Sequence, residues 1–462
     1  MARRDNLTID MWATPKPEPV KIAKLGPEKD GLRHYQLECV RAIHRSFESN
    51  RSVLIVLATG LGKTQVFSSV AKHHEGRVLV LAHRSELVDQ ARARLEHMTG
   101  ELVEVEQGQL RSGRARIVVG SLQTVTRPDR LADLTRKGGF SLVIVDEAHH
   151  LIAPTYRRPI DHFCDAKVLG VTATPDRGDG KAMAQVFDDV AFSMGIDQGV
   201  AQGYLVPFMD CTEVEVKEVS LDAISTRAGD LAAGELDDAM LQGVEGIVRG
   251  MIHHSGDRQG VMFFPGVKSA HMASERLNAI KPGSACSIDG ETPPDERREL
   301  VEAFKAGRYQ FMANCMIATE GFDAPSCSVI GLARPTKSRA LYAQMCGRGT
   351  RVLPGLVEHV PGEEGAGERR ALIASSKKPS LKLIDFVGLN TKHRLMTPYD
   401  LLGGDMDPPE VIAKAKELAD DIDNIDKTAG EILDLSRLEI ARLARSFESK
   451  VKSVSRKFDP FG

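Results

Sequence analysis

Paired cysteines are lacking throughout the sequence. Its seven cysteines are scattered over 462 residues, and no CxxC pair occurs among them. Structural zinc sites usually draw ligands from such pairs, and small secreted domains use cysteines as a disulfide framework. The sequence therefore predicts neither a zinc ribbon nor a set of disulfides, and it is typical of a protein in a reducing compartment.

Long apolar runs and a strong net charge are lacking too. No apolar run approaches the roughly 18 residues that a membrane span needs. The first residues, "MARRDNLTIDMW", carry acids and lack the apolar core of a secretory signal. The formal net charge of -3 gives no overall reason to expect a nucleic-acid partner, although a local groove can still bind a polyanion. We expect a soluble cytoplasmic protein.

Short apolar runs, in contrast, occur in two series. They lie at residues 52–58, 77–82, 115–120, 142–147 and 166–174, and again at 260–265, 285–289, 309–316, 327–333 and 381–388. Runs of this length without polar alternation are typical of strands buried on both faces of a parallel sheet, and helical patterns lie between them. The sequence therefore predicts an α/β protein with two tandem domains, each built on a doubly wound parallel sheet.

The composition also predicts where the domains begin and end. Residues 1–27 are polar and rich in proline, as expected of a flexible arm. The first domain is predicted at 28–203 and the second at 204–400, with a mobile loop rich in glycine, proline and charge at 354–380. Residues 401–462 contain two capping-box patterns and are predicted to form a short helical C-terminal tail. This tail either packs on the second domain or docks a protein partner.

The stretch "LATGLGKT", residues 57–64, follows an apolar run and precedes a helical pattern. A glycine-rich loop between a strand and a helix lets backbone N–H groups wrap a phosphate, with the helix N-terminus aimed at it. Lys63 is placed to reach the β- and γ-phosphates of ATP, and Thr64 to bind Mg²⁺. The strict signature has glycine where this chain has Leu57. The candidate ATP-binding residues here are Thr59, Gly60, Leu61, Gly62, Lys63 and Thr64.

The stretch "LVIVDEAHH", residues 142–150, ends a predicted strand in two carboxylates. Ligands gather at the carboxyl ends of strands in open parallel sheets. Asp146 is placed to hold Mg²⁺, usually through water, and Glu147 to orient and polarise the water that attacks the γ-phosphorus. Zinc is the alternative, but neighbouring histidines point in different directions and "DHFC" at 161–164 is not a standard zinc spacing. We therefore expect nucleotide hydrolysis and no zinc.

Further motifs carry a resemblance to a known family. The first predicted domain contains "LRHYQ" (32–36), "LAHRSELVDQ" (81–90), "VGSLQT" (119–124) and "TATP" (172–175). The second contains "VMFFPGVKSA" (261–270), "ATEGFDAP" (318–325) and "QMCGRGTR" (344–351). Together with the two stretches above, they resemble the motifs of superfamily 2 helicases over about residues 30–395. The resemblance implies two RecA-like domains, and it is greatest to a bacterial, phage and mitochondrial group that includes RadD-like and branch-migration helicases.

The resemblance also implies roles for single residues. For ATP binding it adds Arg33, Gln36, Gly321 and Asp323, with Gln36 on the adenine edge. For coupling between the ATP state and the nucleic-acid groove it implies His149, Thr172, Thr174 and Gln344. For contacts with the nucleic-acid strand it implies Arg84, Ser121, Thr124 and Thr319. Contacts with the phosphate backbone position a strand without reading its sequence.

Two arginines in "QMCGRGTR" complete the predicted active site. Charge spreads over the γ-phosphoryl oxygens in the transition state, and an arginine delivered from a second domain stabilises it. Arg348 and Arg351 are three residues apart on a predicted helix, so we expect them to share one face and to reach across the cleft between the domains. The predicted catalytic set is then Glu147, Asp146, Lys63, Arg348 and Arg351.

These motifs predict an ATP- and Mg²⁺-dependent DNA helicase or translocase. Branched or forked DNA in repair, recombination or replication is the substrate that the resemblance implies. RadD-like proteins tend to carry a cysteine zinc module near the C-terminus, which this chain lacks, so a compact phage or prophage helicase fits better. Three alternatives stay open: an RNA helicase, the motor subunit of a restriction or nuclease complex, and an ATP-gated nucleic-acid clamp without enzymatic activity.

Overall fold

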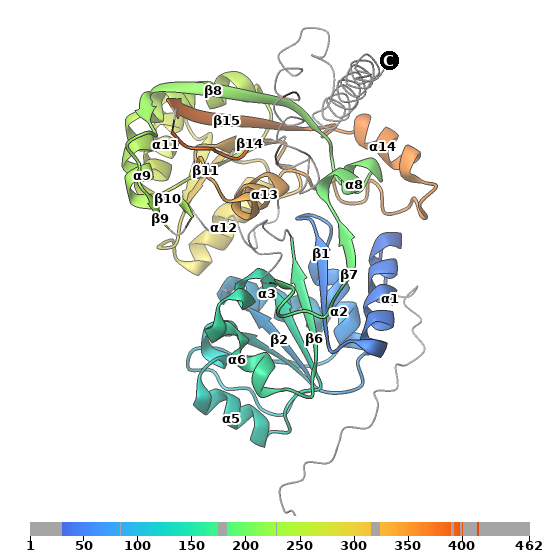
Figure 1. Ribbon diagram of the computed structural model, residues 1–462. Coiled ribbons are helices and arrows are strands. Elements are labelled where there is room, and N and C mark those ends of the chain that lie inside the picture. The colour runs from blue at the N-terminus through green and yellow to red at the C-terminus, as the bar shows by residue number, and fades with distance from the viewer. Residues whose placement is uncertain are drawn as a thin grey trace, which may run out of the picture.

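The computed structural model describes residues 30–83, 85–173, 183–227, 229–315, 324–389 and 392–397, with Asp400 and Lys414. These residues form two α/β domains, which lie one above the other in Figure 1. The predicted arm at 1–27 and, Lys414 apart, the predicted tail at 401–462 lie outside the described residues. For the rest of the chain the predicted fold class, two doubly wound parallel-sheet domains in tandem, is confirmed.

Seven described strands form the sheet of the first domain, and all of their pairings are parallel. In sheet order they are β3 (Val103–Glu106), β4 (Ile117–Ser121), β2 (Val78–Ala82), β5 (Leu142–Asp146), β6 (Lys167–Thr172), β1 (Ser52–Leu57) and β7 (Asp189–Met194). The five central strands coincide with the predicted apolar runs and are buried almost throughout. The sequence does not predict β3 and β7, because these edge strands are partly exposed and carry polar residues.

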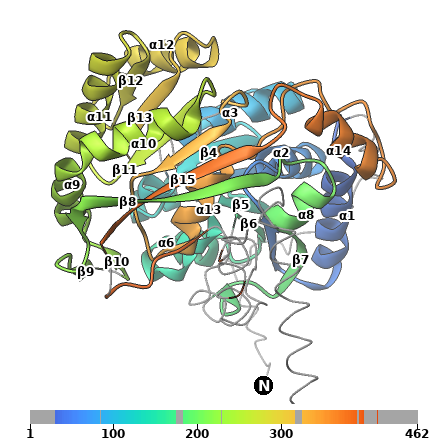
Figure 2. The same ribbon diagram turned by 90° about the horizontal axis from the view of Figure 1, so that it is seen from above.

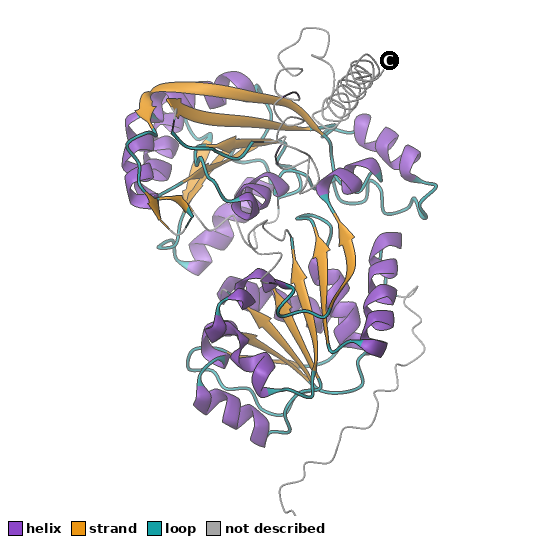
Figure 3. Ribbon diagram, viewed as in Figure 1, coloured by secondary structure: helices purple, strands orange, loops and turns teal. Residues whose placement is uncertain are grey.

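Helices cover both faces of this sheet, as Figure 3 shows. They are α1 (His34–Ser49), α2 (Lys63–His73), α3 (Ser85–Thr99), α4 (Leu122–Val125), α5 (Pro128–Arg136) and α6 (Pro154–His162), with the 3-10 helix η2 (Ala148–Ile152). The short helix α8 (Ile196–Ala201) follows β7 and leads to the second domain (Figure 1). Successive side chains of a strand point to opposite faces, so β1 supplies both cores. Val53, Ile55 and Leu57 belong to the core that contains α1, α2 and α3. Leu54 and Val56 belong to the core that contains α4, α5 and α6.

Six described strands form the sheet of the second domain, again with parallel pairings throughout. In sheet order they are β12 (Ala285–Ile288), β13 (Phe311–Cys315), β11 (Gly260–Phe264), β14 (Val329–Leu332), β15 (Leu381–Leu389) and β8 (Phe208–Ser220). The helices are α9 (Ala233–Gln242), α10 (Val244–Ser255), α11 (Val267–Ile280), α12 (Pro294–Lys305), α13 (Arg339–Gly347) and α14 (Ala366–Ala374), and a hairpin of β9 (Thr226–Arg227) and β10 (Asp230–Leu231) precedes α9. None of the described helices combines the length and the apolar character needed to cross a membrane.

The segment 354–380 differs from its prediction. The sequence predicts a mobile loop there, but the structure contains the helix α14, which lies beside α8 in both views (Figures 1 and 2). Arg369 of α14 is 0% exposed. Its Nε donates to the carbonyl of Gln202 at 2.8 Å, and its Nη1 donates to the carbonyls of Val360 and Gly362 at 3.0 and 2.9 Å. One buried arginine therefore organises the segment, which its polar composition does not reveal.

The same arginine fixes the connection between the two domains. That connection runs from α8 to β8 through Tyr204, whose ring centroid lies 4.2 Å from the guanidinium carbon of Arg369 and 4.7 Å from the ring centroid of Tyr35 in α1. Gly203 has a φ of +70°, and a Cβ there would lie 2.7 Å from Cβ of Arg369. The chain can pass this close to α14 only because residue 203 is glycine.

Replacing Arg369 with methionine tests this role, because methionine keeps much of the side chain's length and removes its donors. The three carbonyls then lose a buried partner, so we expect a loss of stability of roughly 3 kcal/mol. The measurement is the midpoint of thermal unfolding. Arg370→Met is the matched control, since Arg370 is the adjacent, exposed arginine of the same helix. Equal midpoints for the two variants would contradict the role given to Arg369.

Candidate active site

The residues predicted to bind the nucleotide gather at one edge of the first sheet. Because its strands are parallel, their carboxyl ends lie at the same edge, where ligands bind in open α/β sheets. The phosphate loop (residues 57–64) follows β1, Asp146 ends β5, and Thr172 ends β6, which lies between them. Neighbouring strands are about 4.8 Å apart, so about 10 Å separates the phosphate loop from Asp146.

The phosphate loop is shaped by two glycines. Gly60 and Gly62 have φ angles of +92° and +76°, and α2 begins directly after Gly62. A Cβ at Gly62 would lie 2.5 Å from Nε2 of Gln36, so a larger residue has no room. The carbonyl of Leu61 accepts hydrogen bonds from the Tyr35 hydroxyl at 2.7 Å and from Gln36 Nε2 at 3.0 Å, which ties the loop to α1. The result is a cradle before a helix N-terminus, and this shape fits a phosphate group.

A buried ion pair joins the phosphate loop to the carboxylate stretch. Lys63 Nζ lies 3.0 Å from Glu147 Oε1, and the two side chains are 13% and 10% exposed. Burial acts to raise the pKa of Glu147, but the charge and hydrogen bond of Lys63 and the charges of the histidines at 149 and 150 outweigh it, so this pKa lies below its ordinary value. Glu147 is therefore a carboxylate at neutral pH, the state that can orient water and accept a proton.

Glu147 also has an unusual backbone conformation. Its φ is +50°, and it is the one non-glycine residue with a positive φ in the part of the chain that the structure describes. Its N–H donates to Asp146 Oδ1 at 3.0 Å, and η2 starts directly after it. A left-handed conformation costs an ordinary residue about 1 kcal/mol or more, and such strain gathers at functional sites. The strained backbone and the ion pair with Lys63 therefore both indicate Glu147 as a functional residue.

Two histidines extend the site beyond Glu147. His149 Nδ1 lies 3.5 Å from Glu147 Oε2 and 3.4 Å from Thr172 Oγ1, so it connects the carboxylate to the end of β6. His150 stacks on His83, with ring centroids 4.0 Å apart and 21° between the planes. His83 follows β2 and directly precedes Arg84, which is predicted to contact the nucleic-acid strand. The sequence assigns no role to His150, because a stacking partner far along the chain leaves no local signal.

The second domain contributes the segment that ends and follows α13. A Cβ at Gly347, the last residue of α13, would lie only 2.4 Å from Cβ of Thr59. A Cβ at Gly60 would lie 3.2 Å from Thr350 Oγ1 and 3.5 Å from Cγ of Arg351. Figure 1 shows α13 on the side of the second domain that faces the first. The backbone of Gly347 therefore packs against the Thr59 side chain, and the backbone of Gly60 packs against the side chains of Thr350 and Arg351.

The structure corrects one expectation about Arg348 and Arg351. The sequence predicts both on one helical face, but α13 ends one residue before Arg348, which is its C-cap and is 8% exposed. Arg351 instead forms a β-bridge with Leu205, and the N–H of Val206 donates to the carbonyl of Thr350 at 2.8 Å. The helix stops where the chain meets the phosphate loop and the connection between the domains, so both arginines follow the helix and Arg351 is held by that connection.

Arg33 and Gln36 lie at the start of α1. Gln36 is 4% exposed, its Oε1 accepts the N–H of Arg33 at 3.0 Å, and its Nε2 donates to the phosphate loop. Arg33 Nη2 lies 3.3 Å from Glu358 Oε1 of the second domain. Gln36 therefore supports the phosphate loop, and its contact with adenine stays a prediction. Gln344 is a buried residue of α13, and its role in coupling also stays a prediction.

Two residues predicted to contact the nucleic-acid strand are buried. Ser121 and Thr124 are 5% and 4% exposed, and Ser121 Oγ donates to Thr124 Oγ1 at 2.7 Å. Thr124 Oγ1 also accepts the N–H of Gly108 at 3.1 Å. These hydroxyl groups support nearby chain, and their contact with a nucleic acid stays a prediction. The other predicted residues Arg84, Thr174, Thr319, Gly321 and Asp323 lie outside the described residues.

Oxygen ligands suited to a magnesium ion lie at the same sheet edge. Thr64 is in the first turn of α2, and Asp146 ends β5. In nucleotide sites Mg²⁺ takes one or two protein oxygens together with the substrate phosphates, and a hydroxyl and a carboxylate fit that chemistry. Within the described ranges, no group of three or more His, Cys, Asp and Glu side chains is arranged to hold a metal ion by itself.

Comparisons with known proteins match both domains. Residues 29–177 match the family model "Type III restriction enzyme, res subunit", and residues 243–352 match "Helicase conserved C-terminal domain". The chain is 32% identical over 360 residues to the "Putative ATP-dependent helicase IRC3" of Saccharomyces cerevisiae, a match that covers 72% of this chain and 51% of that protein. The chain spans about half the length of the curated relatives it matches.

Solved structures share the fold. The fragment structure of a putative HsdR subunit of a type I restriction enzyme from Vibrio vulnificus YJ016 matches with a TM-score of 0.53 and 20% identity, over 78% of this chain and 67% of that chain. The ATP-dependent type ISP restriction-modification enzyme LlaBIII bound to DNA matches with a TM-score of 0.53 and 16% identity, over 78% of this chain and 32% of that chain. Both likenesses agree with the predicted RecA-like architecture.

Substituting alanine for Gly347 tests the contact between the domains. The added Cβ cannot fit 2.4 Å from Cβ of Thr59, so the segment 347–351 must move away from the phosphate loop. A displacement of about 1 Å at a reacting centre lowers turnover by up to about 100-fold, and we expect at least a tenfold loss of ATP turnover. Gly367→Ala is the control, because a Cβ at Gly367 meets nothing within 4 Å. Wild-type turnover in Gly347→Ala would rule out this contact as a determinant of the site.

The lowered pKa of Glu147 predicts a pH effect on stability. A carboxyl group whose pKa is lower in the folded than in the unfolded protein stabilises the fold above its unfolded pKa, and that contribution is lost as the pH falls. The thermal midpoint of the wild type, relative to that of Glu147→Gln, should therefore decline as the pH falls below about 5, and should go on declining until the pH is below the lowered pKa of Glu147. A difference that stays constant or grows on acidification would contradict the direction of the shift.

Proposed function

Because the chain belongs to superfamily 2 of the helicases, we propose that it is an ATP- and Mg²⁺-dependent DNA helicase or translocase. The observation that carries the proposal is the packing of segment 347–351 on the phosphate loop, next to the buried pair of Lys63 and Glu147. A nucleotide site built from two domains is completed when they close and broken when they open. Hydrolysis at such a site therefore drives relative movement of the domains.

In the proposed reaction the phosphate loop cradles the β- and γ-phosphates of ATP, and Lys63 pairs with their charge. Glu147 accepts a hydrogen bond from the attacking water and takes up its proton. Arg348 and Arg351 stabilise the charge that spreads over the γ-phosphoryl oxygens. When bound beside Asp146, Mg²⁺ neutralises phosphate charge and polarises the phosphoryl oxygens.

DNA is the proposed substrate, and branched or forked DNA in repair, recombination or replication is the finer form of this proposal. The match of the first domain to a restriction enzyme subunit supports DNA, because restriction enzymes act on DNA. An RNA helicase can use the same two-domain core, so stimulation by RNA instead of DNA is the outcome that would replace this substrate.

We also propose that the protein is cytoplasmic and that residues 401–462 dock a protein partner.

A second candidate is the motor subunit of a restriction or nuclease complex. The observations that favour it are the family model of the first domain and the fold shared with an HsdR fragment. The test is purification of the tagged chain with its native partners, followed by ATP-dependent cleavage of plasmid DNA. A nuclease chain that co-purifies in fixed ratio, with cleavage lost in Lys63→Ala, would favour this candidate over a free-standing helicase.

Two substitutions test the proposed hydrolysis. Lys63→Ala removes the charge that pairs with the phosphates, so we expect both ATP binding and ATP turnover to be lost. Glu147→Gln keeps the size of the side chain but cannot take up a proton, so ATP binding should survive while DNA-stimulated turnover falls by about 100-fold or more. The measurements are steady-state ATP hydrolysis with saturating DNA and equilibrium binding of a fluorescent ATP analogue.

The controls come from an exposed ion pair of the second domain. Lys305 and Glu302 of α12 pair at 2.9 Å and are 36% and 61% exposed, so Lys305→Ala and Glu302→Gln repeat the same chemical changes away from the site. Wild-type turnover is then measured on single-stranded DNA, duplex, fork, four-way junction and RNA. Undiminished turnover in both active-site variants would remove the assignment, and a preference for RNA would change the substrate.

A further inference from the structure

A tight turn follows the edge strand β3. Gln107 and Leu110 exchange two backbone hydrogen bonds, at 3.2 and 2.8 Å, and Gly108 to Arg111 are exposed. Leu110 is 60% exposed, one of the few large apolar side chains that stand in solvent among the described residues. A single exposed leucine is ordinary on a protein surface. The turn that carries Leu110, however, is supported by a buried ion pair, which is unusual beneath an exposed turn.

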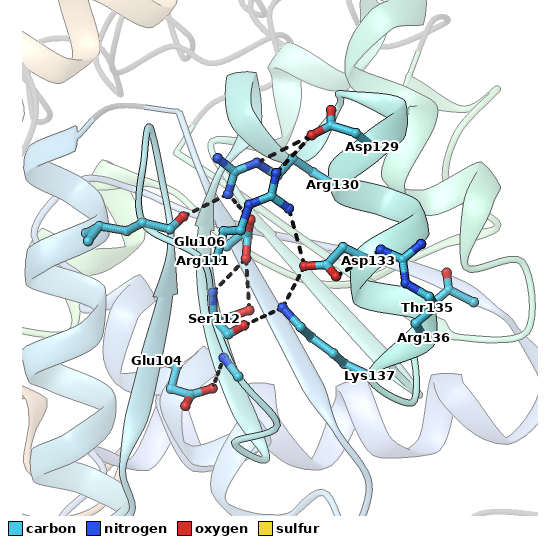
Figure 4. Close-up of polar contacts among 12 residues, drawn as sticks. Glu104, Glu106, Arg111, Ser112, Asp129, Arg130, Asp133, Thr135, Arg136 and Lys137 are labelled. Carbon is cyan, nitrogen blue, oxygen red and sulfur yellow. Dashed lines mark hydrogen bonds and ion pairs between the residues drawn. The ribbon is translucent and has the colours of Figure 1, made fainter.

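A buried ion pair supports the turn from below. Arg130 of α5 and Glu106 at the end of β3 form this pair, with side chains 5% and 0% exposed. Figure 4 shows the two side chains pointing toward each other. The same guanidinium group donates to the carbonyl of Leu110 at 2.8 Å and to that of Gly108 at 2.6 Å. One arginine therefore fixes the backbone at Gly108 and at Leu110, the two ends of the exposed tip of the turn (residues 108–110).

Further hydrogen bonds hold the chain beyond the tip. Glu106 Oε2 accepts the N–H and the hydroxyl of Ser112 at 2.8 and 3.0 Å, and Lys137 Nζ donates to the carbonyl of Ser112 at 2.6 Å (Figure 4). On the other side, the N–H of Gly108 donates to Thr124 Oγ1. The backbone of the turn is thus bonded to buried or partly buried side chains, and the Leu110 side chain projects from a rigid support.

The energetic cost of burying the Arg130–Glu106 ion pair indicates that the pair fixes the position of the turn and is not there to stabilise the fold. The desolvation penalty of a buried ion pair can exceed the attraction between the charges, and apolar residues of similar volume often replace such a pair without loss of stability. A fold that only needed to close β3 could do so with a simple polar turn. The Arg130–Glu106 pair is therefore better explained by the need to hold an exposed tip in one position.

The position of the turn connects it to the predicted nucleic-acid path. Glu106 pairs with Gly120 of β4, and β4 ends at Ser121, so the turn lies at the same sheet edge as the motif 119–124. Thr124 of that motif bonds directly to the turn. In the sheet order five strand intervals separate β3 from β1, which puts the turn about 24 Å from the phosphate loop. The tip is thus near the expected strand and far from the nucleotide.

We propose that the turn 107–110 is a base-contacting element, in which Leu110 packs against the bases of the bound DNA strand and Arg130 is the positioning residue. Apolar side chains that pack on or between bases are a recurrent means of gripping DNA. Such a contact requires a leucine side chain that is exposed and whose backbone is held in place, and Leu110 meets both conditions. The inference rests on the proposed function, since it deepens the description of how that site grips DNA.

Leu110→Gln tests the contact, and the chain offers a matched control. Leu102 lies just before β3, at the opposite end of the same strand, and is 68% exposed. We expect Leu110→Gln to bind a labelled forked DNA about fivefold to tenfold more weakly than the wild type, with a parallel rise in the DNA concentration that half-maximally stimulates ATP hydrolysis. Leu102→Gln should match the wild type in both measurements. The slope of affinity against salt concentration should not change in Leu110→Gln, because no charge is removed.

The double variant Glu106→Met/Arg130→Met tests the positioning role. It replaces the ion pair with apolar residues of similar length, but Ser112 loses its buried acceptor and the tip loses its donors, so the thermal midpoint should fall modestly. The carbonyls of the tip lose their donors, so DNA affinity should fall as it does in Leu110→Gln. DNA affinity is measured well below the midpoint, where the variant is folded, and wild-type affinity there would overturn the positioning part of the inference.

The outcomes separate this inference from the function beneath it. If DNA does not stimulate ATP hydrolysis by the wild type, the proposed function fails. If DNA stimulates the wild type and Leu110→Gln binds within twofold of Leu102→Gln, the function stands and the base contact is refuted. If Leu110→Gln loses affinity through a changed salt slope, the turn contacts phosphates, and the assignment of bases is wrong.

Discussion

The close packing of segment 347–351 of the second domain against the phosphate loop of the first is the constraint on which the site depends. Thr59 lies in the phosphate loop and Gly347 ends α13, and one added carbon on Gly347 would lie 2.4 Å from Cβ of Thr59. A side chain at residue 60 or 347 would collide with the facing side chains, so glycine at these two positions determines how near the arginine-bearing segment comes. The geometry of the site is therefore a property of how the domains are joined.

That join, and two other features of the fold, rely on buried charge. Arg369 holds the connection between the domains, the Lys63–Glu147 pair joins the phosphate loop to β5, and the Arg130–Glu106 pair supports the turn after β3. Buried ionic groups are seldom a net source of stability, because their desolvation offsets their attraction. Their common effect here is geometric, since each holds a particular length of backbone in one place while the apolar cores supply the stability.

The features that could be predicted from the sequence are those whose signal is local. The strands β1 and β5 are apolar along their length, and the glycines before Lys63 lie within a few residues of one another, so a short window reveals both. The sequence does not reveal the strands β3, β7 and β8, because these strands lie at the edges of the sheets and mix polar and apolar residues. The sequence does not reveal the helix α14 either, because the contact that organises it, from Arg369 to Gln202, joins residues 167 apart. Burial of an arginine is a property of the fold, and a window of sequence does not contain it.

The carboxylate stretch shows how one turn of chain can serve two neighbours. The N–H of His150 donates to the carbonyl of Glu147 at 3.1 Å, which closes the first turn of η2. His150 stacks on His83 at the end of β2, while His149 contacts Thr172 at the end of β6. Glu147 and both histidines thus belong to one short 3-10 segment, which brings the carboxylate, the ring stacked on His83 and the contact with Thr172 together. The stretch thus links the nucleotide edge to β2 by covalent structure, with one imidazole on each side.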